Sequence, residues 1–140
     1  MNNQRKIVRV RDVMKHGVDL ADGMTTVADA LSEARHPETK CLVIRKRDEN
    51  DEFGFVAYSD IAKQVLARDR APERVNLYEI MTKPVLGVSP DMDIRYCVRL
   101  FENFGIARAP VIEHGEVLGI VGYTDIVLQG MHPQSDAQSD

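Results

Sequence analysis

Two short stretches of the sequence place a hydroxyl residue and a carboxylate side by side after a tyrosine. They read "GFVAYSDI" at residues 54–61 and "GIVGYTDI" at residues 119–126. An ionised carboxylate, such as that of Asp60 or Asp125, can accept hydrogen bonds from both hydroxyls of a ribose, and such charge-assisted bonds belong to the strong class. The stretches therefore predict two places where the chain could hold a sugar that carries a vicinal diol.

The same residues also have a purely structural interpretation. Each stretch is typical of a strand followed by a helix, with Ser59 or Thr124 as the N-cap and the aspartate in the first turn. An acidic residue there stabilises a helix by about 0.3–1 kcal/mol through the helix dipole. The free N–H groups of the same helix start would favour a phosphate. The aspartates are therefore either structural or ligand-binding at this point.

Residue patterns for other chemistry are missing from the sequence. There is no Gly-rich phosphate loop and no G-x-S-x-G elbow, and the four histidines have no metal-ligand spacing. Cys41 and Cys97 lie among apolar residues and are predicted to be buried thiols. Because the chain repeats one type of site, a single asymmetric acid–base pair is disfavoured. We therefore expect no enzyme activity, no metal and no catalytic cofactor.

Composition limits the partners that the chain could take. Its 140 residues suit about one ordinary domain, and a net charge of −4 gives no general attraction to nucleic acid. No apolar run approaches the ~20 residues of a membrane helix, and the first residues contain no apolar signal core. We predict a cytoplasmic protein with no nucleic-acid or membrane partner.

The two stretches belong to a tandem repeat that covers nearly the whole chain. Met14 matches Met81, Gly54 matches Gly119, and "CLVI" at 41–44 matches "APVI" at 109–112. The main difference is the charged loop "RKRDENDE", which is longer than its counterpart "EHGE", a stretch with hairpin character. The predicted division is a first unit at 8–70, a second unit at 71–131 and a disordered tail at 132–140.

Hydrophobic periodicity gives both repeats the same order of elements. Apolar residues recur at helical spacing after each first extended piece, and two strands and a closing helix follow. The order is β-α-β-β-α, twice, which places the fold in the α/β class (α+β type) with two small mixed sheets flanked by helices. The helical positions are Val27, Ala30, Leu31 and Ala34 in the first unit and Ile94, Cys97, Val98 and Phe101 in the second.

The helix that begins near Ile94 has an unusually wide apolar face. With Leu100 and Phe104 included, this face spans roughly 160° of the helical wheel, whereas a core-facing stripe needs about 100°. Either the helix is a well-covered core helix, or part of the face meets another subunit.

This pattern resembles the CBS domain pair, or Bateman module, in a free-standing form. The resemblance covers about residues 8–131 and rests on "RDVM", "YEIM", "CLVI…GFVAYSDI" and "GIARAPVIEHGEVLGIVGYTDIV". It implies two units with pseudo-twofold symmetry, two clefts for adenosine-type ligands (AMP, ADP, ATP, NAD or S-adenosylmethionine) and a homodimer formed through helices. It also implies a regulatory role, with an enzyme or transporter as the regulated partner.

In this family each cleft combines the aspartate of one unit with walls from the other. The resemblance thus pairs Asp60 with residues 82–85 and 106–111, and Asp125 with residues 15–18 and 39–42. The cationic residues in these walls have two interpretations. They bind the phosphates of a ligand, or they are solvated surface charges. The predicted ligand-binding residues are Tyr58, Ser59, Asp60, Lys83, Pro84, Val85, Ile106, Arg108, Ala109 and Pro110 for the first cleft, and Lys15, His16, Lys40, Cys41, Tyr123, Thr124 and Asp125 for the second.

Two departures from the family pattern bear on binding. Ala57 and Gly122 stand where the family often has Ser or Thr, which removes a hydrogen bond worth about 0.5–1.5 kcal/mol from each cleft. The first unit also lacks a counterpart of Pro110, so the cleft of Asp60 is favoured. The sequence predicts a sensor that binds an adenosine-containing ligand, and the alternative is a ligand-free dimerisation or interaction module.

Overall fold

The computed structural model describes residues 6–131, so the predicted tail at 132–140 lies outside the described residues. The chain divides into two compact units. We call residues Gly17–Leu86 the continuous unit. The split unit combines the segment up to His16 with the segment from Gly87 onward. The predicted boundary between residues 70 and 71 separates the two sequence repeats. The division into compact units follows contacts in the fold, so it does not test that boundary.

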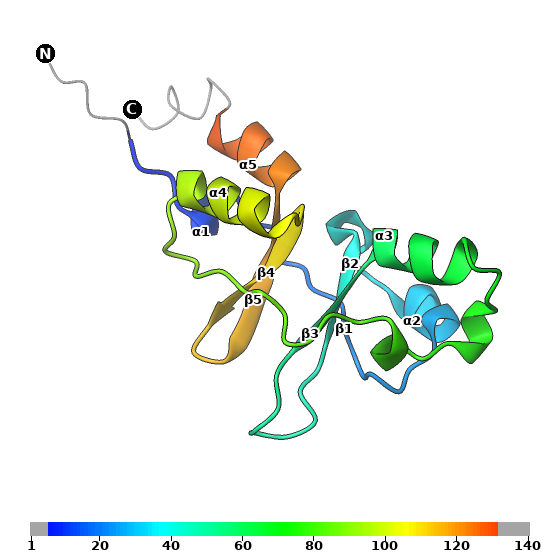
Figure 1. Cartoon of the computed structure of the whole chain (residues 1–140). Helices are drawn as coiled ribbons and strands as arrows, with labels where there is room; N and C mark the ends of the chain where they lie inside the picture. The colour runs from blue at the N-terminus through cyan, green and yellow to red at the C-terminus, as the bar shows by residue number, and fades with distance from the viewer. Residues whose placement is uncertain (1–5, 132–140) are drawn as a thin grey trace, which may run out of the picture. The chain divides into compact units, whose positions relative to one another are not determined.

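The continuous unit is built on a three-stranded mixed sheet (Figure 1). Strand β2 (Cys41–Ile44) lies between β1 (Leu20–Ala21), to which it is parallel, and β3 (Gly54–Ala57), to which it is antiparallel. All four residues of β2 are buried, as expected for a strand covered on both faces. The helices are α2 (Val27–Glu33) and α3 (Tyr58–Ile61), which a π-helical stretch (Ala62–Leu66) continues.

Short 3₁₀ turns complete the continuous unit. They span Pro37–Thr39, Pro72–Arg74 and Leu77–Glu79. The core forms where the sheet meets α2 and the residues after α3, and its buried members are Val27, Ala30, Leu42, Ile44, Val56, Val65, Val75 and Leu77.

The split unit is built on an antiparallel hairpin of β4 (Arg108–Glu113) and β5 (Glu116–Gly122). His114 and Gly115 at its tip both have positive φ, 53° and 76°, as a two-residue hairpin turn with the twist of its strands requires. The predicted hairpin is confirmed. In Figure 1, α4 (Ile94–Phe104) and α5 (Tyr123–Gly130) lie beside each other above this hairpin, and α1 (Val10–Val13) packs on α5.

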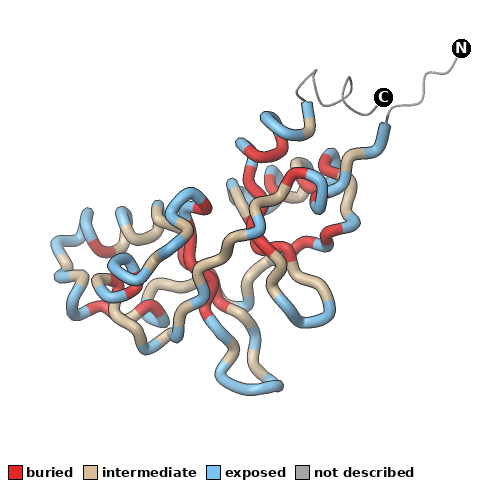
Figure 2. Tube along the Cα trace, turned by 180° about the vertical axis from the view of Figure 1, so that it is seen from behind, coloured by how far each residue is buried: buried red, intermediate tan, exposed pale blue. Residues whose placement is uncertain are grey.

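Buried residues follow the strands and the inner faces of the helices (Figure 2). In the split unit the core contains Phe101 and Cys97 from α4, both fully buried, together with Val10 from α1 and Val121 from β5. The first extended piece of this unit is reduced to one parallel bridge between Val88 and Val111. The predicted α/β class, with small sheets flanked by helices, is confirmed.

The predicted starts of the closing helices are wrong by two residues. Helix α3 begins at Tyr58 with Ala57 as its N-cap, and α5 begins at Tyr123 with Gly122 as its N-cap. Ser59 and Thr124 are therefore in the first turn and are not N-caps. The physical reason is that the aspartate three residues after the N-cap accepts the N-cap's N–H, which stabilises the earlier start.

Helix α2 is shorter than its apolar pattern indicates. It ends at Glu33, so Ala34 is the residue after the helix. Leu31 is 41% exposed, while Val27 and Ala30 are buried. Only the first part of the predicted apolar face thus packs into the core.

Candidate functional site

The carboxylate of Asp60 has a fixed orientation and one oxygen without a partner. Its Oδ2 accepts a hydrogen bond from the N–H of Ala57, with an N···O distance of 2.9 Å. Its Oδ1 has no hydrogen bond or ion pair within residues 6–131, and the side chain is only half-buried. Asp60 can therefore accept further hydrogen bonds without losing its contact to the helix start.

The carboxylate of Asp125 has both oxygens engaged. Oδ2 accepts from the N–H of Gly122 at 2.9 Å, and Oδ1 forms an ion pair with Nζ of Lys15. The Asp125 residue is only 8% exposed. A ligand hydroxyl at this carboxylate would compete with the ammonium group of Lys15.

The position of Lys15 is set by backbone pairing with β5. Its N–H donates to the carbonyl of Ile120 at 2.8 Å, and the N–H of Ile120 donates back to the carbonyl of Lys15 at 2.9 Å. Gly119 permits this approach, because a Cβ there would collide with the carbonyl oxygen of Lys15. The glycine of the repeated stretch thus has a packing role beside the aspartate.

The continuous unit contains the same backbone arrangement with a different side chain. Phe55 and Thr82 exchange two backbone hydrogen bonds of 2.9 Å, one residue after Gly54. Thr82 follows Met81 as Lys15 follows Met14, so the two pairings have the same register. Threonine has no charged group, and Asp60 consequently has no counterpart of the lysine that occupies Asp125.

Lys83, which is predicted to bind ligand phosphates, forms an ion pair with an acidic residue of the charged loop. Its Nζ lies 2.7 Å from Oδ1 of Asp51, and the N–H of Arg47 donates to Oδ2 of Asp51 at 2.8 Å. The hydrogen bond from Lys83, reinforced by that from Arg47, holds the pKa of the Asp51 carboxyl well below its usual range. The sequence does not predict this pair, because the loop contains several acidic residues and its path determines which of them reaches Lys83.

Other predicted site residues lie around the two junctions within their own units. The carbonyl of Lys40 accepts from the N–H of Tyr58 at 2.9 Å, and buried Cys41 pairs with Ala57. In the split unit Arg108 pairs with Gly122. Among the remaining predicted residues, Ala109 and Pro110 are buried, Val85 and Ile106 are half-buried, and His16, Ser59, Pro84, Tyr123 and Thr124 are exposed.

The predicted clefts each draw residues from both units. Asp60 and Lys83 belong to the continuous unit, whereas Arg108 and Pro110 belong to the split unit; Asp125 and His16 belong to the split unit, whereas Lys40 belongs to the continuous unit. The two cleft sets therefore stay predictions.

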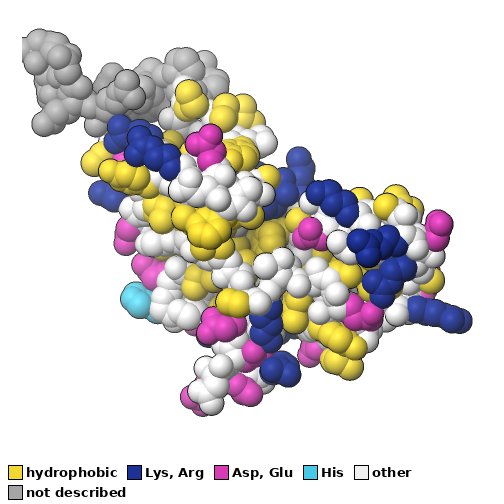
Figure 3. Space-filling view, in the orientation of Figure 1, with side chains coloured by type: hydrophobic (Ala, Val, Ile, Leu, Met, Phe, Trp, Pro, Cys, Tyr) yellow, Lys and Arg dark blue, Asp and Glu magenta, His cyan; other side chains and the backbone are white. Residues whose placement is uncertain are grey.

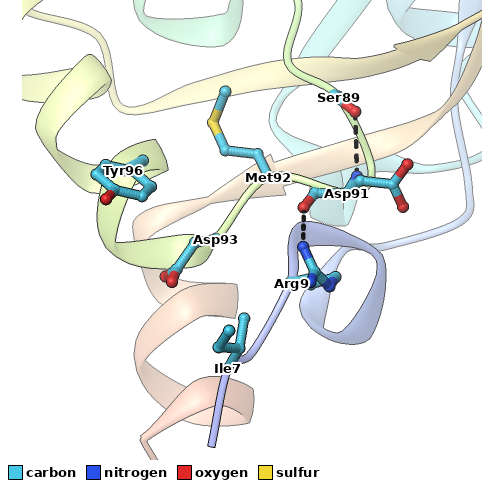
Figure 4. Close-up of a pocket in the computed structure, with 7 residues that line it drawn as sticks. All are labelled: Ile7, Arg9, Ser89, Asp91, Met92, Asp93 and Tyr96. Carbon is cyan, nitrogen blue, oxygen red and sulfur yellow. Dashed lines mark hydrogen bonds between the residues drawn. The ribbon is translucent and has the colours of Figure 1, made fainter. Parts of the chain in front are cut away.

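A hollow of about 600 Å³ in the split unit offers no unpaired acid (Figure 4). Nη1 of Arg9 donates to the carbonyl of Asp91 at 2.6 Å, and the Asp91 carboxylate pairs with Arg11, whose hydrogen bond lowers the pKa of that carboxyl. Asp93 forms an ion pair of 2.8 Å with Arg95. The charged residues of this hollow therefore stabilise the segment before α4 and are not free to bind a ligand.

Two further expectations concern metal and thiol chemistry. Within residues 6–131 no cluster of three potential metal ligands is present. Cys41 and Cys97 are both buried, as predicted, and burial raises the pKa of the Cys97 thiol to about 11. At neutral pH Cys97 is therefore a protonated core residue.

In the part of the chain that the structure describes, every helix is too short or too polar to span a bilayer.

Comparison with known proteins identifies related sequences and folds. The family model described as "CBS domain" matches residues 77–130. An uncharacterised protein of Methanopyrus kandleri, MK0525, is 29% identical over 104 residues, which are 74% of this chain and 52% of the relative. The chain spans between 20% and 62% of the length of the curated relatives that it matches.

Two solved structures have a closely similar fold. A hexameric CBS-CP12 protein from bloom-forming cyanobacteria is 34% identical, with a TM-score of 0.84 over 89% of this chain and 69% of that chain. The CBS domain pair of protein MJ0100, solved in complex with 5′-methylthioadenosine and S-adenosyl-L-methionine, is 25% identical, with a TM-score of 0.72 over 86% of this chain and 94% of that chain.

Proposed function

This chain belongs to the CBS-domain family, and we propose that it is a regulatory module that binds an adenosine-containing ligand through the carboxylate of Asp60. The related domain pair of MJ0100 was solved with 5′-methylthioadenosine and S-adenosyl-L-methionine, which share an adenosine group with a ribose diol. The proposal assigns binding and no chemical step.

The open oxygen of Asp60 is the observation that carries the proposal. Oδ2 is held by the N–H of Ala57, so the carboxylate is already oriented, while Oδ1 has no partner within residues 6–131. A hydrogen bond to a charged group stabilises a complex by about 1.5–3 kcal/mol when both groups are otherwise unpaired. The wall residues that the resemblance assigns to Asp60, including Lys83, Arg108 and Pro110, are part of the proposal.

Asp125 is proposed as the weaker of the two ligand-binding carboxylates. Because Lys15 already occupies its Oδ1, a ribose hydroxyl at this oxygen has to compete with the lysine ammonium group. Binding at Asp60 would act on a regulated enzyme or transporter only through different affinities for two states of the module. The cytoplasmic location predicted from the sequence belongs to the same proposal.

A thermal-shift panel on the full chain tests the proposal. We expect at least one of AMP, ADP, ATP, NAD, S-adenosylmethionine and 5′-methylthioadenosine to raise the melting temperature, because a ligand at 100 times its Kd adds about 2.7 kcal/mol of stability. The 2′-deoxy analogue of the active ligand should give a much smaller rise, since it lacks one of the two hydroxyls.

The matched variants are Asp60→Asn and Asp29→Asn. Asp29 occupies the same third helical position in α2 and is exposed, so it controls for the helix-dipole contribution of an acidic residue. Asp60→Asn should abolish the ligand-induced rise, and Asp29→Asn should leave it intact. A response that is equal for ribo and deoxy ligands, or that survives Asp60→Asn, would contradict the proposal.

A second candidate function, an interaction module, is favoured by the helices of the split unit. A hollow of about 470 Å³ lies over α4 and α5, with Ile94, Val98 and Ile126 among its lining residues. Other apolar side chains of α4 and α5 are well exposed: Phe104 is 60% and Leu128 55% exposed. We propose a homodimer through these two helices, in line with the wide apolar face of the helix that begins at Ile94.

Light scattering tests the dimer. The wild type should have the mass of a dimer, and Leu128→Lys should shift it toward the monomer. Leu66→Lys, at an exposed leucine of the continuous unit, should not. A wild type that stays monomeric at high concentration would remove the proposed interface. An assembly of this kind with no response to any of the adenosine ligands would favour the interaction module over the sensor.

A further inference from the structure

We propose that the continuous unit has a second ligand site, separate from Asp60, for a small molecule that joins a phosphoryl group to a flat apolar body. The site is a hollow of about 680 Å³, a size within the range of about 300–1,000 Å³ that is typical of small-molecule sites. The residues that line it are Asp22, Gly23, Met24, Ile44, Arg45, Lys46, Arg47, Tyr78, Met81 and Lys83.

The lining of this hollow carries an excess of positive charge. It contains four cationic side chains and one acid, Asp22, whose Oδ1 already accepts from the N–H of Met24 at 2.8 Å. Asp51 pairs with Lys83 and with Nε of Arg47, and so neutralises part of the charge. The charge that remains favours an anion.

Two of the cationic side chains have no acidic partner within residues 6–131. The side chain of Arg45 has no hydrogen bond or ion pair within residues 6–131 and is exposed. The ammonium group of Lys46 lies 5.0 Å from the centre of the Phe53 ring, a contact that leaves its charge in place. Planar guanidinium and ammonium donors together suit the oxygens of a phosphoryl group.

Apolar side chains form the rest of the hollow. Ile44 is buried, whereas Tyr78 is 50% and Met24 69% exposed although both are large and apolar. Tyr78 is held in place by its N–H, which donates to the carbonyl of Gly23 at 2.9 Å. Figure 3 shows Lys and Arg side chains next to hydrophobic ones just above the loop at the bottom of the view. An exposed ring and thioether beside cations fit a ligand with a flat apolar part.

The strand register separates this hollow from Asp60. Ile44, which lines the hollow, pairs with Gly54 at the beginning of β3. Cys41 pairs with Ala57 at the end of β3, where Asp60 follows. The hollow and Asp60 are therefore at opposite ends of the β2–β3 pair. Lys83, which lines the hollow and is also assigned to the cleft of Asp60, is the one described residue that the two proposed sites share.

The test is a titration of the isotope-labelled full chain with phenyl phosphate, followed by amide chemical shifts. We expect shifts at residues 22–24, 44–47 and 78–83, and weaker binding of inorganic phosphate and of phenol, which each lack half of the ligand. Binding should weaken as salt is raised, because exposed charges are screened.

Matched double variants separate a site from general attraction. The double variant Arg45→Gln with Lys46→Gln should weaken phenyl phosphate binding by at least about tenfold. A loss of this size corresponds to at least one charge-assisted contact. Lys63→Gln with Arg74→Gln makes the same charge change at exposed cations outside the hollow and should have no effect. Asp60→Asn should also leave this binding unchanged, which distinguishes it from the adenosine site.

Three results would overturn the proposal. They are the absence of shifts at the hollow with millimolar phenyl phosphate, an equal loss of binding in both double variants, and tighter binding of an acidic peptide without a phosphoryl group. The last result would identify the hollow as a docking site for a partner protein.

Discussion

The junction after β3 and the junction after β5 have nearly the same sequence but different electrostatics. Asp60 keeps one carboxylate oxygen without a partner in the described part of the chain, whereas Asp125 has both oxygens engaged, one of them by Lys15. The cause lies in another segment: the residue that pairs with the second strand is Thr82 in one unit and Lys15 in the other. A repeated motif therefore fixes the geometry of a carboxylate. Its availability depends on a residue from another segment, 22 positions after Asp60 in one unit and 110 positions before Asp125 in the other.

The same pairing register explains why only one junction is occupied. Lys15 stands 110 positions before Asp125 and reaches it through the hydrogen bonds that its backbone shares with Ile120. Thr82 makes the equivalent pairing with Phe55, and its side chain is too short to reach across in the same way. The two units can therefore be compared residue by residue, and the following variants test that comparison.

The largest effect is expected at Gly54 and Gly119, the matching glycines of the two repeats. Gly119→Ala should lower the free energy of unfolding by roughly 3 kcal/mol, because the new Cβ would collide with the backbone carbonyl of Lys15. Gly54→Ala should cost roughly 1 kcal/mol, because its Cβ would lie 2.7 Å from the flexible Sδ of Met81, which can move. Urea unfolding of both variants measures the difference, and equal costs would contradict the different surroundings of the two glycines.

The next effect concerns the aspartates as structural residues. Asp125→Ala should cost roughly 2 kcal/mol, because it removes the helix-start hydrogen bond from Gly122 and leaves Lys15 without its acid. Asp60→Ala should cost roughly 1 kcal/mol, since only the bond from Ala57 is lost. Thermal or urea unfolding checks the order, and a larger cost at Asp60 would contradict the assignment of the ion pair.

An exchange of the two pairing residues should reverse the difference in ligand binding. Thr82→Lys should weaken adenosine binding at Asp60 by roughly fivefold, the effect of about 1 kcal/mol from a competing ion pair. Lys15→Thr should strengthen binding at Asp125 by a similar factor. Adenosine is the appropriate probe for calorimetry, because it has no phosphate that a lysine could attract. Unchanged affinities in both variants would show that Lys15 does not control access to Asp125.

The smallest effect is expected for the acid-side stability of two surface ion pairs. Lys83 lowers the pKa of Asp51 in the continuous unit, and Arg11 lowers that of Asp91 in the split unit. A lowered folded-state pKa stabilises the fold above the ordinary carboxyl value of 3.8, and this stabilisation is lost as the pH falls below it.

Asp51→Asn should therefore flatten the loss of stability below about pH 4 more than Asp91→Asn does. The Asp51 side chain is 9% exposed, whereas that of Asp91 is 61% exposed and is screened by solvent. Unfolding curves collected across this range measure both slopes. A steeper change for Asp91→Asn would reverse the expected order.

The sequence was sufficient to predict the elements that depend on local patterns. The hairpin at His114 and Gly115, the buried strand at Cys41–Ile44 and the strand–helix junctions all follow from periodicity and turn residues. The helix starts were misplaced because a side chain three residues inside the helix can cap as well as a residue at its edge.

The ion pairs of the site could not be predicted in the same way. Lys15 was recognised as a candidate cation, but its pairing with Asp125 depends on a bridge between segments at opposite ends of the sequence. The pairing of Lys83 with Asp51 depends on the path of a charged loop. The match between Met14 and Met81 was the one signal that could have placed Lys15 and Thr82 at equivalent positions.

The discontinuity of the split unit has a consequence for the newly made protein. On the ribosome, the continuous unit has all of its residues once Leu86 has emerged, and it can fold as a body at that point. Val10 and Val13, which are 0% and 3% exposed in the finished fold, must wait for β5 and α5 to be translated before they are covered. The nascent chain therefore exposes these two apolar residues until α5 has been translated, and a chaperone can bind them during that interval.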